Sequence, residues 1–390
     1  MSRHVWEGRS KTDLGNAFLK RIRNKVILSE AAIIVLLALA LAIRGKDEVA
    51  ALESAAKLQS GKESNGAGQE GEETKEVIRW VDFDVSYEAL CKAYEWDVSS
   101  HETAYPVNWV DLLAYTATVT VGKFDKKALQ TLDKTAEKLT RGETTMEEQT
   151  GTQKFAKTLS QKFVKTFVYY REAYSAVLDG LVGEYEEERE ENGTKQIYKT
   201  YGLKAFFPLA KGFDYTHYDD FGSGRSYGYK RRHLGHDMLG AIGTPIICIE
   251  TGTVEALGWN QYGGWRIGIR SLDKKRYYYY AHLRQNYPYA EGLEEGMTVT
   301  AGDVIGYMGH TGYSAKENVN NIDVTHLHWG LELIFDESQK DGDAQIWVDV
   351  YALTRFLAKH MQPVQKVPDS REWIRVGQIS PFFRHFFCEK

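Results

Sequence analysis

Cysteine and clusters of basic charge are scarce in this sequence, and each shortage excludes a class of protein. The three cysteines, Cys91, Cys248 and Cys388, lie far apart and form no Cys-x-x-Cys pair. A disulfide framework or a zinc ribbon is therefore not expected. The formal net charge is -5 and the basic residues form no block, so nucleic acid is not an expected partner. The 390 residues are enough for two ordinary domains and terminal segments.

Long apolar runs are also rare, and the one candidate lies near the N-terminus. Residues 31–43 are a continuous apolar run, and residues 26–43 extend it but include Ser29 and Glu30. A spanning helix needs about 20 mostly apolar residues. Basic residues precede the run and acidic residues follow it, so the positive-inside rule places residues 1–25 in the cytoplasm and the rest outside. We expect a single-pass cell-membrane anchor over residues 26–44; the alternative is a signal peptide, cleaved to give a secreted protein.

Two segments of different composition follow the apolar run. Residues 45–79 are rich in Glu, Lys, Gly and Ser and hold almost no core-forming residues, which predicts a flexible linker. Residues 80–190 carry apolar and aromatic residues at helical spacing, which predicts an α-helical domain whose stripes form its core. This domain could position the rest of the chain or bind a partner protein. The charged, turn-forming stretch 186–194 marks its expected boundary.

The pattern changes after residue 196. Short β-rich runs alternate with glycine-containing turns, which predicts an antiparallel all-β domain over residues 196–362. A last helix is expected over residues 347–360, and residues 363–390 form a C-terminal tail without assigned structure. The expected fold class is therefore multidomain, with a transmembrane anchor, an α-helical middle domain and a C-terminal antiparallel β domain.

Seven of the eleven histidines lie between residues 217 and 328, and three groups among them indicate a metal site. A turn through Gly235 can bring the side chains of His233 and Asp237 to one ion. His282 stands at the end of a predicted strand. His326 and His328 are two residues apart, so on a strand both project from the same face.

Zinc suits these residue types. It binds imidazole and carboxylate ligands, and a catalytic zinc site keeps three protein ligands and one water. The remaining histidines would be free for proton transfer, which the pKa of imidazole suits. No His-Glu-x-x-His motif supplies a glutamate base, which favours a histidine in that role.

The motifs occur in the order H-x-G-x-D, Y-x-H-L, a glycine-rich turn over residues 299–314, and H-L-H. In this order they resemble the lysostaphin/LytM family of zinc endopeptidases over roughly residues 200–360. The resemblance implies that His233, Asp237 and His328 bind one zinc ion per chain, and that His282 and His326 flank the open metal position as catalytic residues. It also implies a narrow groove over a β-sheet and cleavage of peptide bonds in bacterial cell-wall peptidoglycan.

Residues 315–325 lengthen the segment between the glycine-rich turn and H-L-H, which predicts a longer loop in the groove wall. We expect His236 to be structural or at the rim, His310 to lie at the rim, and His217 to lie in a loop approaching the groove. The alternative function is a catalytically silent, membrane-anchored scaffold or regulator with the same fold. Such relatives commonly lack a metal or catalytic residue, and this chain lacks none. A protease that acts on proteins or free peptides is a third possibility.

Overall fold

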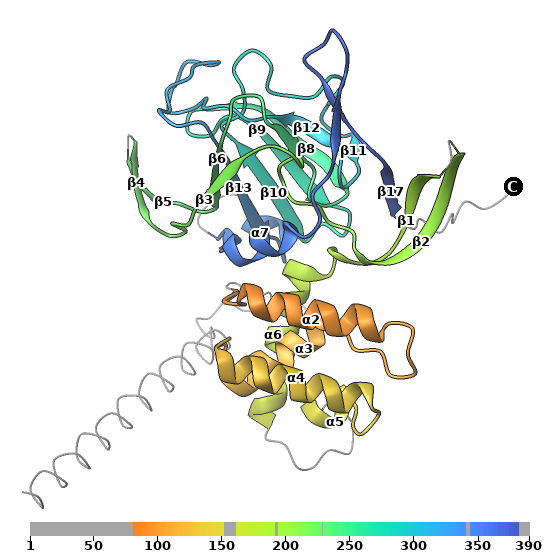
Figure 1. Ribbon diagram of the computed structural model, residues 1–390. Helices are drawn as coiled ribbons and strands as arrows, with labels where there is room; N and C mark the ends of the chain where they lie inside the picture. Colours follow the sequence, from red (N-terminus) through yellow and green to blue (C-terminus); the bar gives the residue numbers. More distant parts are fainter. Residues whose placement is uncertain (1–80, 152–160, 192–193, 228, 341–343, 382–390) are drawn as a thin grey trace, which may run out of the picture. The chain divides into compact units, whose positions relative to one another are not determined.

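The computed structural model describes residues 81–151, 161–191, 194–227, 229–340 and 344–381 (Figure 1). The expected cytoplasmic tail, anchor and linker of residues 1–79 lie outside these ranges. Within the described ranges, no helix is long and apolar enough to span a bilayer. All described residues belong to one unit, Glu76–Lys390.

The predicted helical segment is confirmed over most of its length. Four of its helices begin at a side chain that accepts a hydrogen bond from the backbone of the first turn, which is the usual way to satisfy free N–H groups there. Their apolar stripes face inward, with Leu132 and Ala136 of one helix and Tyr174 and Val177 of another fully buried. The described helices are α2 (Tyr87–Ser100), α3 (Trp109–Thr120), α4 (Lys126–Thr140), α5 (Met146–Thr150) and α6 (Gln161–Leu178).

The end of the predicted helical segment is wrong. Helix α6 stops at Leu178, and strand β1 (Val182–Glu191) pairs antiparallel with β2 (Thr194–Leu203). The register sets Glu186 opposite Lys199, and β17 (Gln378–Pro381) adds to the free edge of β1. Pairing with a C-terminal strand is a long-range interaction, so the local acidic sequence did not reveal it. The expected boundary at residues 186–194 falls on this hairpin.

An eight-stranded sheet carries the histidine motifs, and its order is β11-β8-β9-β10-β13-β6-β3 with β14 also paired to β13. Every pairing in it is antiparallel, which confirms the predicted all-β class for this part of the chain. Its strands are β3 (Tyr215–Tyr218), β6 (His236–Gly240), β8 (Gly252–Asn260), β9 (Gly264–Ser271), β10 (Arg276–Ala281), β11 (Thr298–Val299), β13 (His326–Leu333) and β14 (Ile346–Val348).

Smaller elements border this sheet. Strand β7 (Pro245–Ile247) pairs with β12 (Val304–Tyr307), and β4 (Gly224–Tyr227) forms a hairpin with β5 (Tyr229–Arg232). The predicted helix over residues 347–360 is too long, because Ile346–Val348 is strand and α7 covers only Tyr351–Leu357. The tail also contains regular structure, namely β15 (Val364–Lys366), β16 (Trp373–Arg375) and β17.

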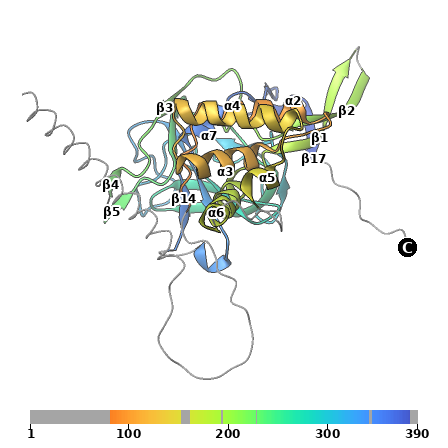
Figure 2. The ribbon, with the colours of Figure 1, turned by 90° about the horizontal axis from the view of Figure 1, so that it is seen from below.

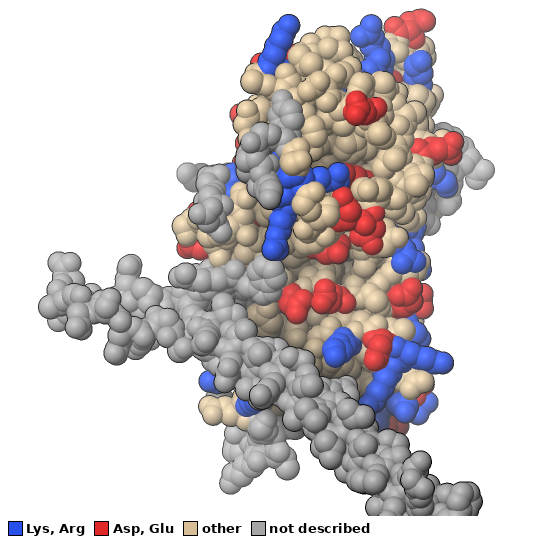
Figure 3. Space-filling model, turned by 90° about the vertical axis from the view of Figure 1, so that its left-hand side faces the viewer, with Lys and Arg blue, Asp and Glu red and all other residues tan. Residues whose placement is uncertain are grey.

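The helices pack against the β part through contacts with α7 and β10. Figures 1 and 2 show α2–α6 gathered on one side of the strands. The ring of Phe356 in α7 lies 5.4 Å from Tyr94 of α2 and 5.7 Å from Trp109 of α3. Arg276 of β10 donates a hydrogen bond of 2.9 Å to the carbonyl of Ala176 in α6. Figure 3 shows acidic and basic side chains interspersed on one face, in keeping with a sequence that has no basic block.

Candidate metal centre and groove

Gly235 lets two neighbouring strands approach closely at the H-x-G-x-D motif. A Cβ at this position would lie 2.5 Å from the ring of His328 and 2.7 Å from the carbonyl oxygen of Trp329. Both distances are far shorter than normal carbon contacts, so only glycine fits here. The chain therefore passes close beneath His328, with His233 before the turn and Asp237 after it.

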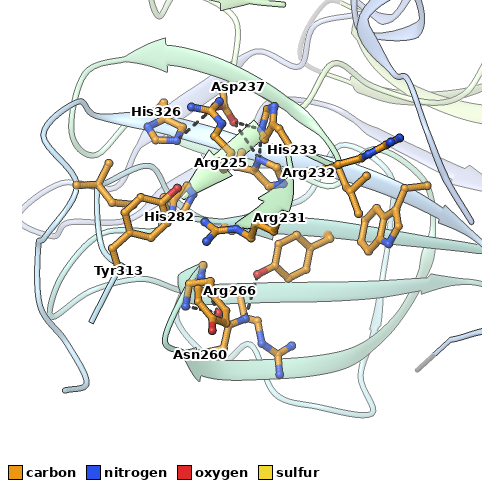
Figure 4. Close-up of a pocket in the computed structure, with 18 of the residues that line it drawn as sticks. Arg225, Arg231, Arg232, His233, Asp237, Asn260, Arg266, His282, Tyr313 and His326 are labelled. Carbon is orange, nitrogen blue, oxygen red and sulfur yellow. Dashed lines mark hydrogen bonds and ion pairs between the residues drawn. The ribbon is translucent and has the colours of Figure 1, made fainter. Parts of the chain in front are cut away.

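The side chains of His233, Asp237 and His328 converge on one point. Figure 4 shows two of them, His233 and Asp237, side by side. His233 Nε2 lies 3.0 Å from Asp237 Oδ1 and 2.9 Å from His328 Nδ1, and His328 Nδ1 lies 2.9 Å from Asp237 Oδ1. Ligands held about 2.0–2.2 Å from a tetrahedral zinc ion lie roughly 3.3 Å apart. The three donor atoms and their spacing thus fit a small divalent cation.

The electrostatics of the cluster keep its side chains in the forms that bind metals. Burial alone would raise the pKa of Asp237, but the contacts with the His233 and His328 side chains hold that pKa well below its usual value. Burial lowers the pKa of His328, although Asp237 opposes this effect. At neutral pH the carboxylate is therefore charged and the His328 imidazole is neutral, as ligation requires.

A second set of charges supports the cluster from behind. His233 Nδ1 lies 2.7 Å from Asp220 Oδ1, which favours a proton on Nδ1 and leaves Nε2 free to bind a metal. Arg225 of β4 places Nη2 2.7 Å from Asp220 Oδ2 and 2.9 Å from Asp237 Oδ2. Sequence reasoning missed Asp220 and Arg225, because neither stands in a recognisable motif.

His282 follows β10 in an unusual backbone conformation. Its φ of 63° lies in the left-handed region, which non-glycine residues seldom adopt and which often marks functional sites. Its N–H donates to Gly263 and its carbonyl accepts from Gly309, at 2.7 and 3.0 Å. Nδ1 lies 3.0 Å from the carbonyl oxygen of Thr311. Because a carbonyl only accepts, Nδ1 carries the proton and Nε2 presents its lone pair.

His326 mirrors this arrangement on the neighbouring strand. Its Nδ1 lies 2.8 Å from the carbonyl oxygen of Val324, and its Nε2 lies 3.8 Å from Asp237 Oδ2. The rings of His326 and His282 are 4.7 Å apart. Burial lowers the pKa of His282 well below its usual value, and this ring is therefore neutral at physiological pH. The imidazoles of His282 and His326 therefore face the side chains of His233, Asp237 and His328. His326 and His328 lie on the same face of their strand, as their i, i+2 spacing predicted.

The remaining histidines of this region lie elsewhere. His236 points to the other side of β6 from Asp237, where its Nε2 lies 2.9 Å from His217 Nδ1 and its ring contacts Tyr351. Burial, followed by the neighbouring His217, lowers the pKa of His236 to about 3. The expectation that His217 lies in a loop is wrong, because it is part of strand β3, paired with β6. His310 contacts the carbonyl of Ile322 at 2.7 Å.

A groove of about 940 Å³ opens above the cluster and the two flanking histidines. Tyr277 and Tyr279 line it, whereas Tyr278 and Tyr280 are fully buried on the opposite face of β10, as strand alternation predicts. The inserted loop forms part of its wall, which confirms the longer wall expected from the sequence. The loop residues concerned are Asn321, Ile322, Asp323 and Val324.

Part of the chain is similar to known proteins. Residues 231–341 match the model of Peptidase family M23. The chain is 36% identical over 140 residues to the L-Ala–D-Glu endopeptidase of Bacillus subtilis (strain 168), covering 35% of this chain and 41% of the relative. It is 35% identical over 89 residues to the lysostaphin of Staphylococcus simulans, covering 23% of this chain and 17% of the relative.

A solved structure from Ruminococcus gnavus, assigned as a candidate glycyl-glycine endopeptidase lytM, is 24% identical and covers 70% of this chain and 91% of its own, with a TM-score of 0.41. The chain spans less than half the length of the curated relatives named above.

Proposed function

We propose, from the peptidase family M23 domain that residues 231–341 form, that the protein is a zinc-dependent endopeptidase that hydrolyses peptide bonds of bacterial cell-wall peptidoglycan. The observation that carries the proposal is the convergence of His233, Asp237 and His328 beneath a groove. Two further histidines flank the cluster, so no expected part of the catalytic set is missing.

The names of the relatives give two types of target bond. One relative is named for the L-Ala–D-Glu bond and another for the glycyl-glycine bond. A glutamate linked through one of its two carboxyl groups keeps the other free, so the first target carries a negative charge beside the bond. A run of glycines carries none. Either bond could be cut by the same chemistry.

In this proposal His233, Asp237 and His328 hold one zinc ion per chain. Zinc bound there would supply a Lewis acid and lower the pKa of a water molecule towards about 7. The Nε2 atom of His282 or His326 accepts a proton from the attacking water. That proton then passes to the nitrogen of the departing amine, and the second imidazole donates a hydrogen bond to the developing oxyanion when it is protonated.

The test uses the purified full chain and its bound zinc. We expect near-stoichiometric zinc by elemental analysis and release of new amino groups from purified peptidoglycan sacculi, abolished by a chelator and restored by zinc. His233→Ala should lose both zinc and activity, since it removes a ligand. His282→Ala should keep the zinc and lose activity by about 10²- to 10⁴-fold, since it removes a proton-transfer group.

His101→Ala is the matched control, because His101 lies in the loop after α2 and does not border the groove. Its zinc content and its activity should equal those of the parent. A zinc-loaded parent that releases no amines would support the silent scaffold instead. Equal activity in the parent and His282→Ala would refute the assigned mechanism.

We also propose that an N-terminal anchor holds the enzyme at the outer face of the cell membrane. The support is the apolar run over residues 31–43 and the basic residues before it. Membrane fractionation of cells expressing the full chain should find it in the membrane, and protease added outside should remove residues 45–390. A protein found in the medium with a new N-terminus near residue 43 would favour the cleaved signal.

A further inference from the structure

Arg231 is a charged residue of the groove that the proposed chemistry leaves unused. It lies on β5 opposite Arg225 and borders the same cavity as His282. Its guanidinium carbon lies 4.8 Å from the centre of the Tyr262 ring and 5.0 Å from that of Tyr313. Figure 4 shows Arg231 in the middle of the cavity, with His282 to its left and Arg266 below.

The guanidinium of Arg231 has no anionic partner among the described residues. Its Nη1 atom is buried and donates no hydrogen bond to a described residue. Two of the other cations that border the groove are paired: Arg225 contacts two carboxylates and Lys340 contacts Glu255. A buried donor without an acceptor is costly, so natural proteins seldom keep one without a ligand or a role for it.

The surroundings of Arg231 suit a carboxylate that comes from outside the chain. The two tyrosine rings fix the cation by cation–π contact, which leaves its in-plane N–H groups available. That planar fork matches the two oxygens of a carboxylate. Arg266 also borders the cavity and forms no ion pair with a described residue, so a second positive charge faces the same space.

The carboxylates that border the groove do not neutralise Arg231. Asp237 is held by His233, His328 and Arg225. Asp323 is exposed on the inserted loop, and neither it nor Glu332 forms an ion pair with Arg231. The middle of the groove therefore carries positive charge that no described carboxylate neutralises.

We propose that Arg231 is a specificity residue that binds a free carboxylate of the substrate, so that the enzyme prefers peptide bonds flanked by an acidic residue to uncharged bonds. The proposal rests on the proposed function and adds to it the chemical class of the substrate. It places the specificity on the β4–β5 hairpin rather than on the metal ligands.

The experiment compares two synthetic peptides that contain an L-Ala–D-Glu bond and differ in one group, a free α-carboxylate or its carboxamide. With the zinc-loaded full chain, kcat/KM should favour the free acid by about 10- to 100-fold, the usual contribution of a charge-assisted hydrogen bond. Arg231→Gln should reduce that ratio to below about 3-fold by lowering the rate on the acid alone. The rate on the carboxamide and the zinc content report that the variant is folded.

Arg232→Gln is the matched control, because it removes the same charge from the next residue. Figure 4 shows Arg232 on the far side of His233 from Arg231. This variant should keep most of the preference for the acid. A parent that cuts both peptides equally, or an Arg231→Gln variant that keeps the preference, overturns the proposal. An equal loss in Arg232→Gln would also overturn it, because the effect would then be that of overall charge.

Binding separates this proposal from the proposed hydrolysis. In the His282→Ala background, calorimetry should show the acid peptide binding at least about 10-fold more tightly than the carboxamide, and Arg231→Gln should abolish the difference. Selective binding without cleavage by the parent would reject the hydrolysis and retain the role of Arg231. Cleavage without selectivity would reject the role of Arg231 and retain the hydrolysis. The absence of both binding and cleavage would reject the hydrolysis and the role of Arg231.

Discussion

Gly235 shows how tightly the converging side chains are packed. Replacement by alanine would press a methyl group against the His328 ring, at a distance of 2.5 Å. The ring would have to turn, so we expect Gly235→Ala to bind zinc about 10- to 100-fold more weakly, as do other changes that disturb the orientation of a ligand. Competition with a chelating dye measures this affinity.

Gly224→Ala provides the comparison for that measurement. Nothing lies within 4 Å of the Cβ it would add, and its φ is not in the left-handed region. It should bind zinc as the parent does. Unchanged zinc affinity in Gly235→Ala would show that His328 tolerates the displacement and would contradict the steric argument.

The sequence predicted which side chains converge but not the charges around them. His326 and His328 share a face because strand alternation is local, and the spacing of His233 and Asp237 about Gly235 is local as well. Arg225 and Arg231 reach the site only because the β4–β5 hairpin folds back over it. That return is a tertiary event, and no motif around these arginines signals it.

At the scale of elements, strands were predicted where their apolar pattern is clear. Strand β10 alternates between the groove and the core, and β13 is mostly buried, so both were recognisable. Strand β1 reads VGEYEEEREE and has no such pattern. Its conformation depends on pairing with β2 and β17, one of which is nearly 200 residues away along the chain. The apolar residues before α7 were merged into a helix because short strands and helices share such runs.

Arg276 joins two elements that the sequence assigned to different domains. Its side chain is 2% exposed, and it contacts Glu250 at 2.8 Å, Asp273 at 2.9 Å and the carbonyl of Ala176 in α6. Removing one partner of a buried ion pair leaves the other charge unpaired. We therefore expect Arg276→Ala to lower the free energy of unfolding by about 3–5 kcal/mol, measured by urea denaturation.

Lys92→Ala is the contrasting change. Lys92 pairs with Asp133 at 2.6 Å, but the two side chains are 39% and 34% exposed. Such pairs contribute about 0–1 kcal/mol, so the variant should unfold close to the parent. If both variants unfolded at the same urea concentration, the buried pair would not be what links α6 to the sheet.

For the whole molecule, buried histidines predict sensitivity to acid. Burial lowers the pKa values of His217 and His360 and, together with His217, that of His236 to about 3. Below the unfolded-state pKa of about 6.5, the unfolded chain binds protons that the folded chain does not. Stability is therefore full above that pH and falls as the pH drops, by up to about 1.4 kcal/mol per unit for each such histidine.

His360 offers a clean test because it lies outside the groove. Its Nδ1 contacts the carbonyl of Ala205 at 3.0 Å and its ring stacks on Phe206. Urea unfolding of the parent should show a marked loss of stability between pH 7 and pH 5, and His360→Gln should show a smaller one. A loss of the same size in the variant would exclude His360 as a contributor.

The hydrogen bond from Arg276 to Ala176 also has a consequence for the evolution of the helical and β parts of the chain. The family match begins at residue 231, yet this bond reaches back to a helix that ends at Leu178. A gene fusion that joined a new N-terminal segment at residue 204 would remove the Ala176 carbonyl that accepts this hydrogen bond and leave a buried Arg276 donor without its acceptor. The helices and the β part are therefore expected to pass together through recombination, and their contact residues to change together rather than one at a time.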